Sequence, residues 1–90
     1  MDKDWLSGIL GYNAENKRYG LLKRDLWEID GFHCGKRLQV KIDGEWIDTR
    51  MEMDWVNGQG VWCLVDTPLR GTDLEQLSVR IHIGCPFDED

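Results

Sequence analysis

The sequence is poor in several features that would point directly to a class of protein. It has three cysteines, Cys34, Cys63 and Cys85, and no Cys-x-x-Cys pair. Such an odd, sparse set is a poor disulfide framework and suits a reducing compartment. No apolar run approaches the roughly 20 residues that a membrane-spanning helix needs. Residues 1–6 are charged with both signs and lack the apolar core of a signal peptide, so we expect a cytoplasmic protein.

Basic residues are outnumbered, with 11 Lys and Arg against 17 Asp and Glu, and the net charge is −6. Because affinity for nucleic acid comes largely from Lys and Arg, we do not expect direct nucleic-acid binding. An acidic chain more often meets other proteins, or imitates nucleic acid and occupies the basic groove of a nucleic-acid-binding protein. The acidity also serves solubility, which is its commonest explanation.

Catalytic motifs are also missing. No cysteine lies in a nucleophile motif, and no glycine-rich loop has the spacing of a phosphate-binding loop. The carboxylates Asp48, Glu52 and Asp54 recur at short spacing, but Arg50 alternates with them. That pattern is typical of a solvated lattice of charges rather than an acid–base pair. We therefore expect a protein that is not an enzyme and that uses no cofactor.

The set of residues that most resembles a metal site is His33, Cys34, His82 and Cys85. The spacing of His82 and Cys85 suits zinc, whereas His33 and Cys34 would point in opposite directions if they were neighbours in a strand. In the alternative interpretation Cys34 and Cys63 are small buried hydrophobic residues and His82 is an exposed strand residue. We favour this alternative and expect no metal site.

The strongest positive signal is a hairpin over residues 37–55, in which apolar and polar residues alternate on both sides of Asp43 and Gly44. This pair favours a two-residue type I′ turn, because both central positions of that turn need positive φ. The resulting register places Lys41 opposite Trp46, and a longer loop would shift it by one residue and turn Trp46 inward. The core face would hold Leu38, Val40, Ile42, Ile47, Thr49 and Met51. The outer face would hold Arg37, Gln39, Lys41, Trp46, Asp48, Arg50 and Glu52.

Other stretches predict further strands, at residues 8–12, 18–22, 61–65 and 78–83. Residues 23–29 carry apolar side chains at helical spacing, and we interpret them as a long loop with one turn of helix. The Thr-x-x-Glu pattern of residues 72–75 has the form of a capping box and predicts a single helical turn. The pattern as a whole predicts an all-β domain over residues 1–90 with short flexible termini. We expect a small antiparallel SH3-like barrel or sandwich of about five to six strands, with one short helical turn before the last strand.

Trp46 is the main candidate for a functional residue, because it is the one apolar side chain on the predicted outer face of the hairpin. It either packs under a loop or a neighbouring strand, or anchors a partner, as Trp and Arg often do in interfaces. We predict a non-enzymatic module that binds a protein partner through Lys41, Trp46, Asp48 and Arg50. The alternative is an acidic decoy or accessory factor that acts on a nucleic-acid-binding protein. The protein would be a monomer, or a homodimer through an exposed strand edge.

Short segments spread over residues 8–81 resemble those of a known family. They are Tyr12-Asn13, Arg18-Tyr19-Gly20-Leu21, His33-Cys34-Gly35, Gly44-Glu45-Trp46-Ile47, Trp62-Cys63-Leu64 and the run from Leu74 to Ile81. In these segments the chain resembles a small domain family of unknown function from Firmicutes and their mobile elements. The resemblance implies a bacterial cytoplasmic protein, and it supplies no activity and no site residues.

Overall fold

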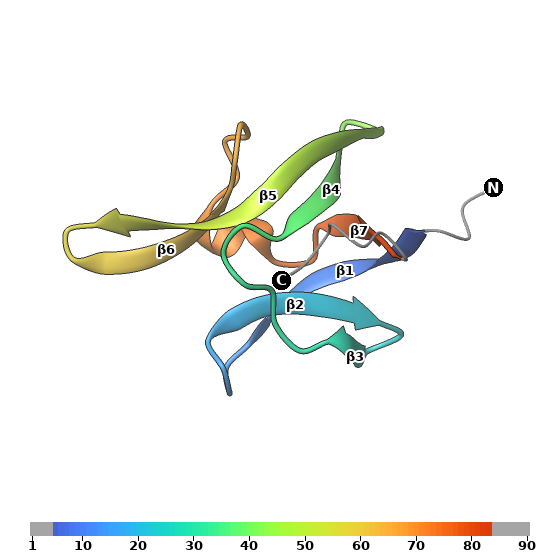
Figure 1. The fold of residues 1–90 in the computed structure, drawn as a ribbon, viewed down its shortest axis with the longest axis horizontal. Coiled ribbons are helices and arrows are strands. Elements are labelled where there is room, and N and C mark those ends of the chain that lie inside the picture. The colour runs from blue at the N-terminus through green and yellow to red at the C-terminus, as the bar shows by residue number, and fades with distance from the viewer. Residues whose placement is uncertain (1–4, 84–90) are drawn as a thin grey trace.

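Seven antiparallel strands form one sheet that curls into a half-barrel, in the order β3-β2-β1-β7-β4-β5-β6 (Figure 1). The computed structural model describes residues 5–83 of the chain. The strands are β1 (Trp5–Asn13), β2 (Arg18–Lys23), β3 (Leu26–Ile29), β4 (Arg37–Ile42), β5 (Glu45–Val56), β6 (Gln59–Leu64) and β7 (Ser78–His82). A 3₁₀ turn, η1 (Gly71–Leu74), precedes the last strand. The predicted all-β fold with one short helical turn before the last strand is therefore confirmed.

The central hairpin has the predicted register. Lys41 lies opposite Trp46 and Val40 lies opposite Ile47. The turn residues Asp43 and Gly44 have φ angles of 52° and 83°, as a type I′ turn requires. The predicted core face is also confirmed, since its residues are buried or partly buried.

The number of strands exceeds the predicted five to six, because the interpretation of residues 23–29 as a loop with a helical turn was wrong. Arg24 and Asp25 both have positive φ, 54° and 66°, and form a tight turn from β2 into β3. The apolar residues at helical spacing do not share a buried face, since Leu26 is 69% exposed. Trp27 lies on the outer face, beside Gly11 and Leu22, and does not cover the core.

The core fills the inside of the curl. Leu10, Leu21, Val40 and Val79 come from four strands and are fully buried there, and Phe32 enters from the connection between β3 and β4. Because the concave side is packed with side chains, the convex side is the broad surface that the sheet presents to solvent.

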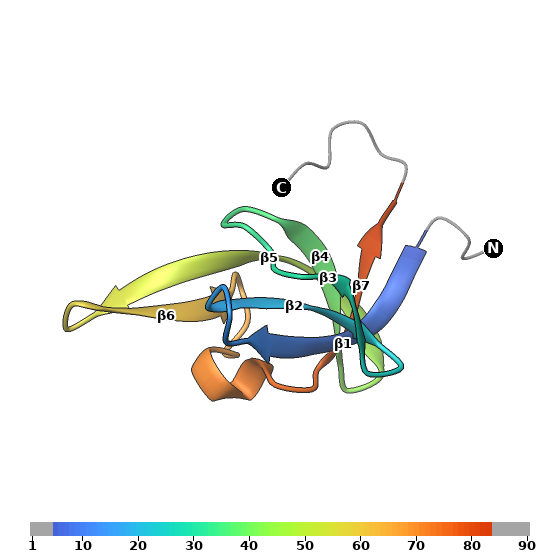
Figure 2. The same cartoon turned by 90° about the horizontal axis from the view of Figure 1, so that it is seen from below.

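The 3₁₀ turn η1 lies below the sheet in Figure 2 and contributes Leu74, which is fully buried. Its cap differs from the predicted one: the backbone N–H of Arg70 donates to Oδ2 of Asp73, at 3.4 Å. The turn thus begins before Thr72, so Asp73 and not Glu75 takes the position of the capping acid.

The N-terminal strand is longer than predicted, because Trp5, Leu6 and Ser7 pair with β7. The prediction that both termini are flexible concerns residues 1–4 and 84–90, which lie outside the described residues. Between residues 5 and 83, no helix has the length and apolar character needed to span a bilayer.

Candidate functional site

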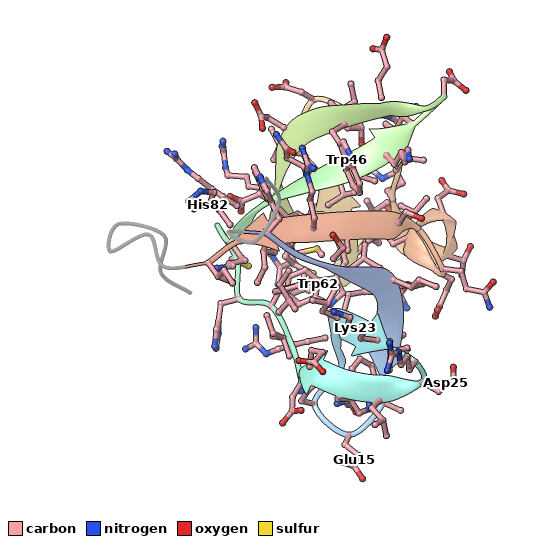
Figure 3. The ribbon with its side chains drawn as sticks, turned by 90° about the vertical axis from the view of Figure 1, so that its right-hand side faces the viewer. Glu15, Lys23, Asp25, Trp46, Trp62 and His82 are labelled. Atoms are coloured by element: carbon pink, nitrogen blue, oxygen red, sulfur yellow. The ribbon has the colours of Figure 1, made fainter. Side chains whose placement is uncertain are left out.

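The outer face of the sheet carries the residues that the sequence analysis selected. Nζ of Lys41 lies 5.4 Å from the ring centroid of Trp46, which it partly covers. Trp46 is partly exposed, and Lys41 and Asp48 are exposed. Figure 3 shows Trp46 on the hairpin that β4 and β5 form, well separated from Trp62. Lys41, Trp46 and Asp48 therefore share one accessible surface.

Arg80, on β7, is held between two indole rings. Its guanidinium carbon lies 4.2 Å from the ring centroid of Trp5 and 4.4 Å from that of Trp46. Each such cation–π contact stabilises by about 0.5–2 kcal/mol, depending on how far water is excluded. Trp5 belongs to β1 and Trp46 to β5, so the stack joins strands on both sides of β7. We call Trp5, Arg80 and Trp46 the tryptophan–arginine stack.

A chain of hydrogen bonds fixes the edge of the same guanidinium. Nε of Arg80 donates to Oε1 of Gln39 at 2.7 Å, and Nε2 of Gln39 donates to Oδ1 of Asp48 at 2.6 Å. Gln39 lies directly opposite both residues in the neighbouring strands. Arg80 is thus held by two rings and by a hydrogen bond at one edge, which leaves the surrounding surface little freedom to lose when a partner binds.

Arg50, the fourth predicted binding residue, is not part of this network. Its Nε donates to Oε2 of Glu52 on the same strand, at 3.0 Å, and both side chains are well solvated. Asp54 forms a second ion pair, with Arg70. These pairs agree with the predicted lattice of solvated charges, and exposed pairs of this kind contribute little to stability.

Sequence reasoning missed three members of the network, Trp5, Gln39 and Arg80, as binding residues. The alternation of Arg80 with the buried Val79 and Ile81 is a local signal that it lies on the outer face. What the sequence did not reveal is that β7 lies between β1 and β4, because strand neighbours far apart in the chain leave no local signal.

A shallow hollow of about 380 Å³ lies at one end of β4 and β5. Arg37 and Arg50 line it, directly opposite one another in the two strands. Like charges in such a position repel each other. The carboxylates of Asp48 and Asp66 line the same hollow and offset this repulsion.

A second hollow, of about 500 Å³, opens between the β1–β2 hairpin, the β5–β6 hairpin and η1. Tyr12 and Tyr19 line it, with their rings at 63° and their centroids 5.3 Å apart. Nε1 of Trp62 donates to the backbone oxygen of Lys17 at 3.0 Å, which joins the two hairpins. The sequence analysis did not select this site.

Tyr19 is a titratable residue that lines this second hollow. Its hydroxyl donates to the backbone oxygen of Gly71 at 3.0 Å. Burial, together with the nearby negative charge of Glu75, raises the pKa of Tyr19 above its usual value. Tyr19 is therefore a neutral hydrogen-bond donor at physiological pH.

The residues considered as metal ligands do not converge within the described part of the chain. His33 and Cys34 are exposed in the connection between β3 and β4, whereas His82 packs edge-on against Trp5, with centroids 5.0 Å apart. Among residues 5–83, no three His, Cys, Asp or Glu side chains form a group that could hold a metal ion. Cys85 lies outside the described residues.

The cysteines differ in part from the prediction. Cys34 is exposed and is not a small core residue, because Phe32 is the side chain that anchors this connection in the core. Cys63 is partly buried on β6, and its burial raises the pKa of the thiol. A raised pKa lowers the fraction of reactive thiolate at neutral pH.

Comparison with known protein families shows to which family this chain belongs. A model of the domain of unknown function DUF5348 matches residues 8–81. The chain belongs to this family. No curated protein and no solved structure matches it. The DUF5348 range includes Gln39, Trp46, Asp48 and Arg80 but leaves out Trp5. The resemblance to a small family of unknown function is thereby confirmed, whereas the bacterial origin that it implied stays a prediction.

Proposed function

We propose that this protein is a non-enzymatic interaction module that binds a protein partner through the outer face of its sheet. Lys41, Trp46, Asp48 and Arg50 form this surface, with the tryptophan–arginine stack at its centre. The observation that carries the proposal is the position of Arg80 between Trp5 and Trp46. A charged side chain held between two rings on an accessible sheet face provides a rigid contact surface.

The chemistry of the surface supports binding rather than catalysis. Trp and Arg are the residue types that most often dominate interface energetics, particularly where their side chains are already ordered. The face is also uncovered: between residues 5 and 83, no helix or second sheet packs over β4 and β7. A sheet usually has one face against the core and can leave the other to solvent or to a partner.

We further propose that the module acts in a bacterial cytoplasm and is encoded on a mobile element, as its family resemblance implies. The alternative, which the acidity of the chain supports, is a decoy or accessory factor that acts on a nucleic-acid-binding protein. In that case the partner would itself be a protein that binds DNA or RNA.

Quantitative capture from a bacterial lysate tests the proposal. We compare wild type with Trp46→Ala and with Trp55→Ala, a matched control. Trp55 is 69% exposed at the far end of the β5–β6 hairpin, outside the proposed surface. We expect wild type and Trp55→Ala to capture the same protein and Trp46→Ala to lose it. Capture of the same set by all three would show that the outer face is not the binding surface.

Loss of capture by Trp46→Ala counts as loss of binding only if this variant is folded, because the substitution removes one side of the tryptophan–arginine stack. Thermal melts and tryptophan fluorescence of each variant establish that it is folded at the capture temperature. Lys41→Glu provides a second variant in the same surface, with an exposed side chain and little expected effect on stability. If the captured protein binds DNA or RNA, the decoy form of the proposal is favoured.

A further inference from the structure

The two central strands of the outer face differ in charge from the chain as a whole. The net charge of the protein is −6. By the alternation of side chains, the outer face of β4 carries Arg37, Gln39 and Lys41, and that of β7 carries Ser78, Arg80 and His82. Neither strand places a carboxylate on this face. We call Arg37, Lys41 and Arg80 the basic band.

The cations of the basic band are largely available to a ligand. Among the described residues, Arg37 and Lys41 form no ion pair, and Nζ of Lys41 lies over the ring of Trp46. Arg80 uses one N–H group, at Nε, to bind Gln39. Its terminal nitrogens make no hydrogen bond to the described residues. A guanidinium whose terminal N–H groups are not engaged can bind a carboxylate in a bidentate manner.

We propose that the ligand of this surface is an acidic segment of a protein partner, with its carboxylates on the basic band. This inference rests on the proposed function and names the chemistry of the partner. Trp5 and Trp46 flank the band, so an apolar side chain next to a glutamate or aspartate has an aromatic surface to cover. Charge complementarity and aromatic contact thus point to the same kind of segment.

A protein segment fits this surface better than a nucleic acid. A long polyanion would extend beyond the basic band and meet the negative field of the remaining chain, including Asp43 and Glu45 at the end of the hairpin. A short acidic segment carries fewer charges past the band, although it meets Asp48, which β5 places opposite Gln39 on the same face.

The test measures the binding of labelled peptides by fluorescence anisotropy. The probes are a peptide of alternating Glu and Leu, the same peptide with Lys in place of Glu, and a single-stranded oligonucleotide of equal negative charge. We expect the Glu peptide to bind and the Lys peptide not to bind. Arg37→Glu and Lys41→Glu should each weaken binding of the Glu peptide by roughly three- to tenfold at about 0.1 M salt, where the Debye length is about 10 Å.

Lys23→Glu is the matched control, because it makes the same change in net charge at an exposed position outside the basic band. The affinity of this variant for the Glu peptide should stay within about twofold of the wild-type affinity, since charges farther from the peptide than a Debye length are largely screened. Equal weakening by Lys23→Glu would show that overall charge, not the band, attracts the peptide. Tighter binding of the oligonucleotide than of the Glu peptide would also overturn the inference, in favour of a nucleic acid.

Failure of this inference is distinguishable from failure of the proposed function. If no Glu peptide binds but a partner is still captured through Trp46, the partner is not acidic and the interaction module stands. If capture is insensitive to Trp46, the proposed function fails, whatever the peptides do.

Discussion

The guanidinium carbon of Arg80 lies 4.4 Å from the ring centroid of Trp46, although their strands do not pair with one another. β4 lies between β7 and β5, and strands two apart in a sheet are separated by about 10 Å. The two long side chains therefore reach toward each other across β4, and Nε of Arg80 also donates a hydrogen bond to Oε1 of Gln39 on that strand.

The first prediction follows from this contact. Arg80→Met keeps most of the aliphatic stem but removes two cation–π contacts and the hydrogen bond to Gln39. We expect the free energy of unfolding to fall by about 1–3 kcal/mol, measured by urea denaturation. Arg80→Lys keeps the charge without the planar group, and it should fall between wild type and Arg80→Met. Equal stability of Arg80→Met and wild type would show that the stack has no net effect.

The second prediction concerns Gly20, on β2. A Cβ atom at this position would collide with the backbone oxygen of Ile29, which cannot move without displacing the chain after β3. We expect Gly20→Ala to lower the free energy of unfolding by more than about 2 kcal/mol. Chemical denaturation followed by tryptophan fluorescence measures this.

Gly60→Ala is the control for Gly20→Ala. A Cβ atom at Gly60 would collide with Sδ of Met53, a flexible side chain that can adopt another rotamer. Its cost should stay below about 1 kcal/mol, as is usual where a side chain can repack. A larger loss for Gly60→Ala than for Gly20→Ala would contradict the assignment of the close contacts.

The third prediction concerns the turn between β2 and β3. Arg24 and Asp25 both have positive φ, which is unfavourable for Arg and is tolerated better by Asp, Asn and above all Gly. Replacement of the pair by Asn-Gly should raise the free energy of unfolding by about 0.5–1.5 kcal/mol, because this dipeptide favours a type I′ turn. Thermal denaturation of the double variant measures the gain, and a loss of stability would mean that the turn is not of this type.

The fourth prediction is a dependence on alkaline pH. Because the pKa of Tyr19 is raised in the folded protein, its contribution to stability is complete below the ordinary tyrosine pKa of about 10. This contribution decreases as the pH rises through the raised pKa, since the phenolate has lost the hydrogen bond to Gly71 and is repelled by Glu75. The difference between the ultraviolet titrations of wild type and Tyr19→Phe should show a midpoint above 10. A midpoint at or below 10 would contradict the burial of this hydroxyl.

Several elements of the fold could be predicted because their causes are local. Asp43 and Gly44 determine a turn by their own φ preferences, and the alternation of side chains then sets which residues of β4 and β5 face the core. The turn before β7 was also predictable, although its capping acid was not. Strand β3 was missed because the turn before it consists of Arg24 and Asp25, and it contains no glycine or asparagine, which most often mark a tight turn.

For the candidate site, the sequence by itself determined that Lys41 and Trp46 face each other on the outer side of a hairpin. That followed from turn geometry and from a period of two residues. Only the tertiary structure decided what lies beside them, because the order of strands in a sheet depends on contacts between distant segments. β7 comes to lie between β1 and β4, and this placement brings Arg80 between Trp5 and Trp46. The stack exists because burial of Val79 and Ile81 against the core holds β7 there and turns Arg80 outward.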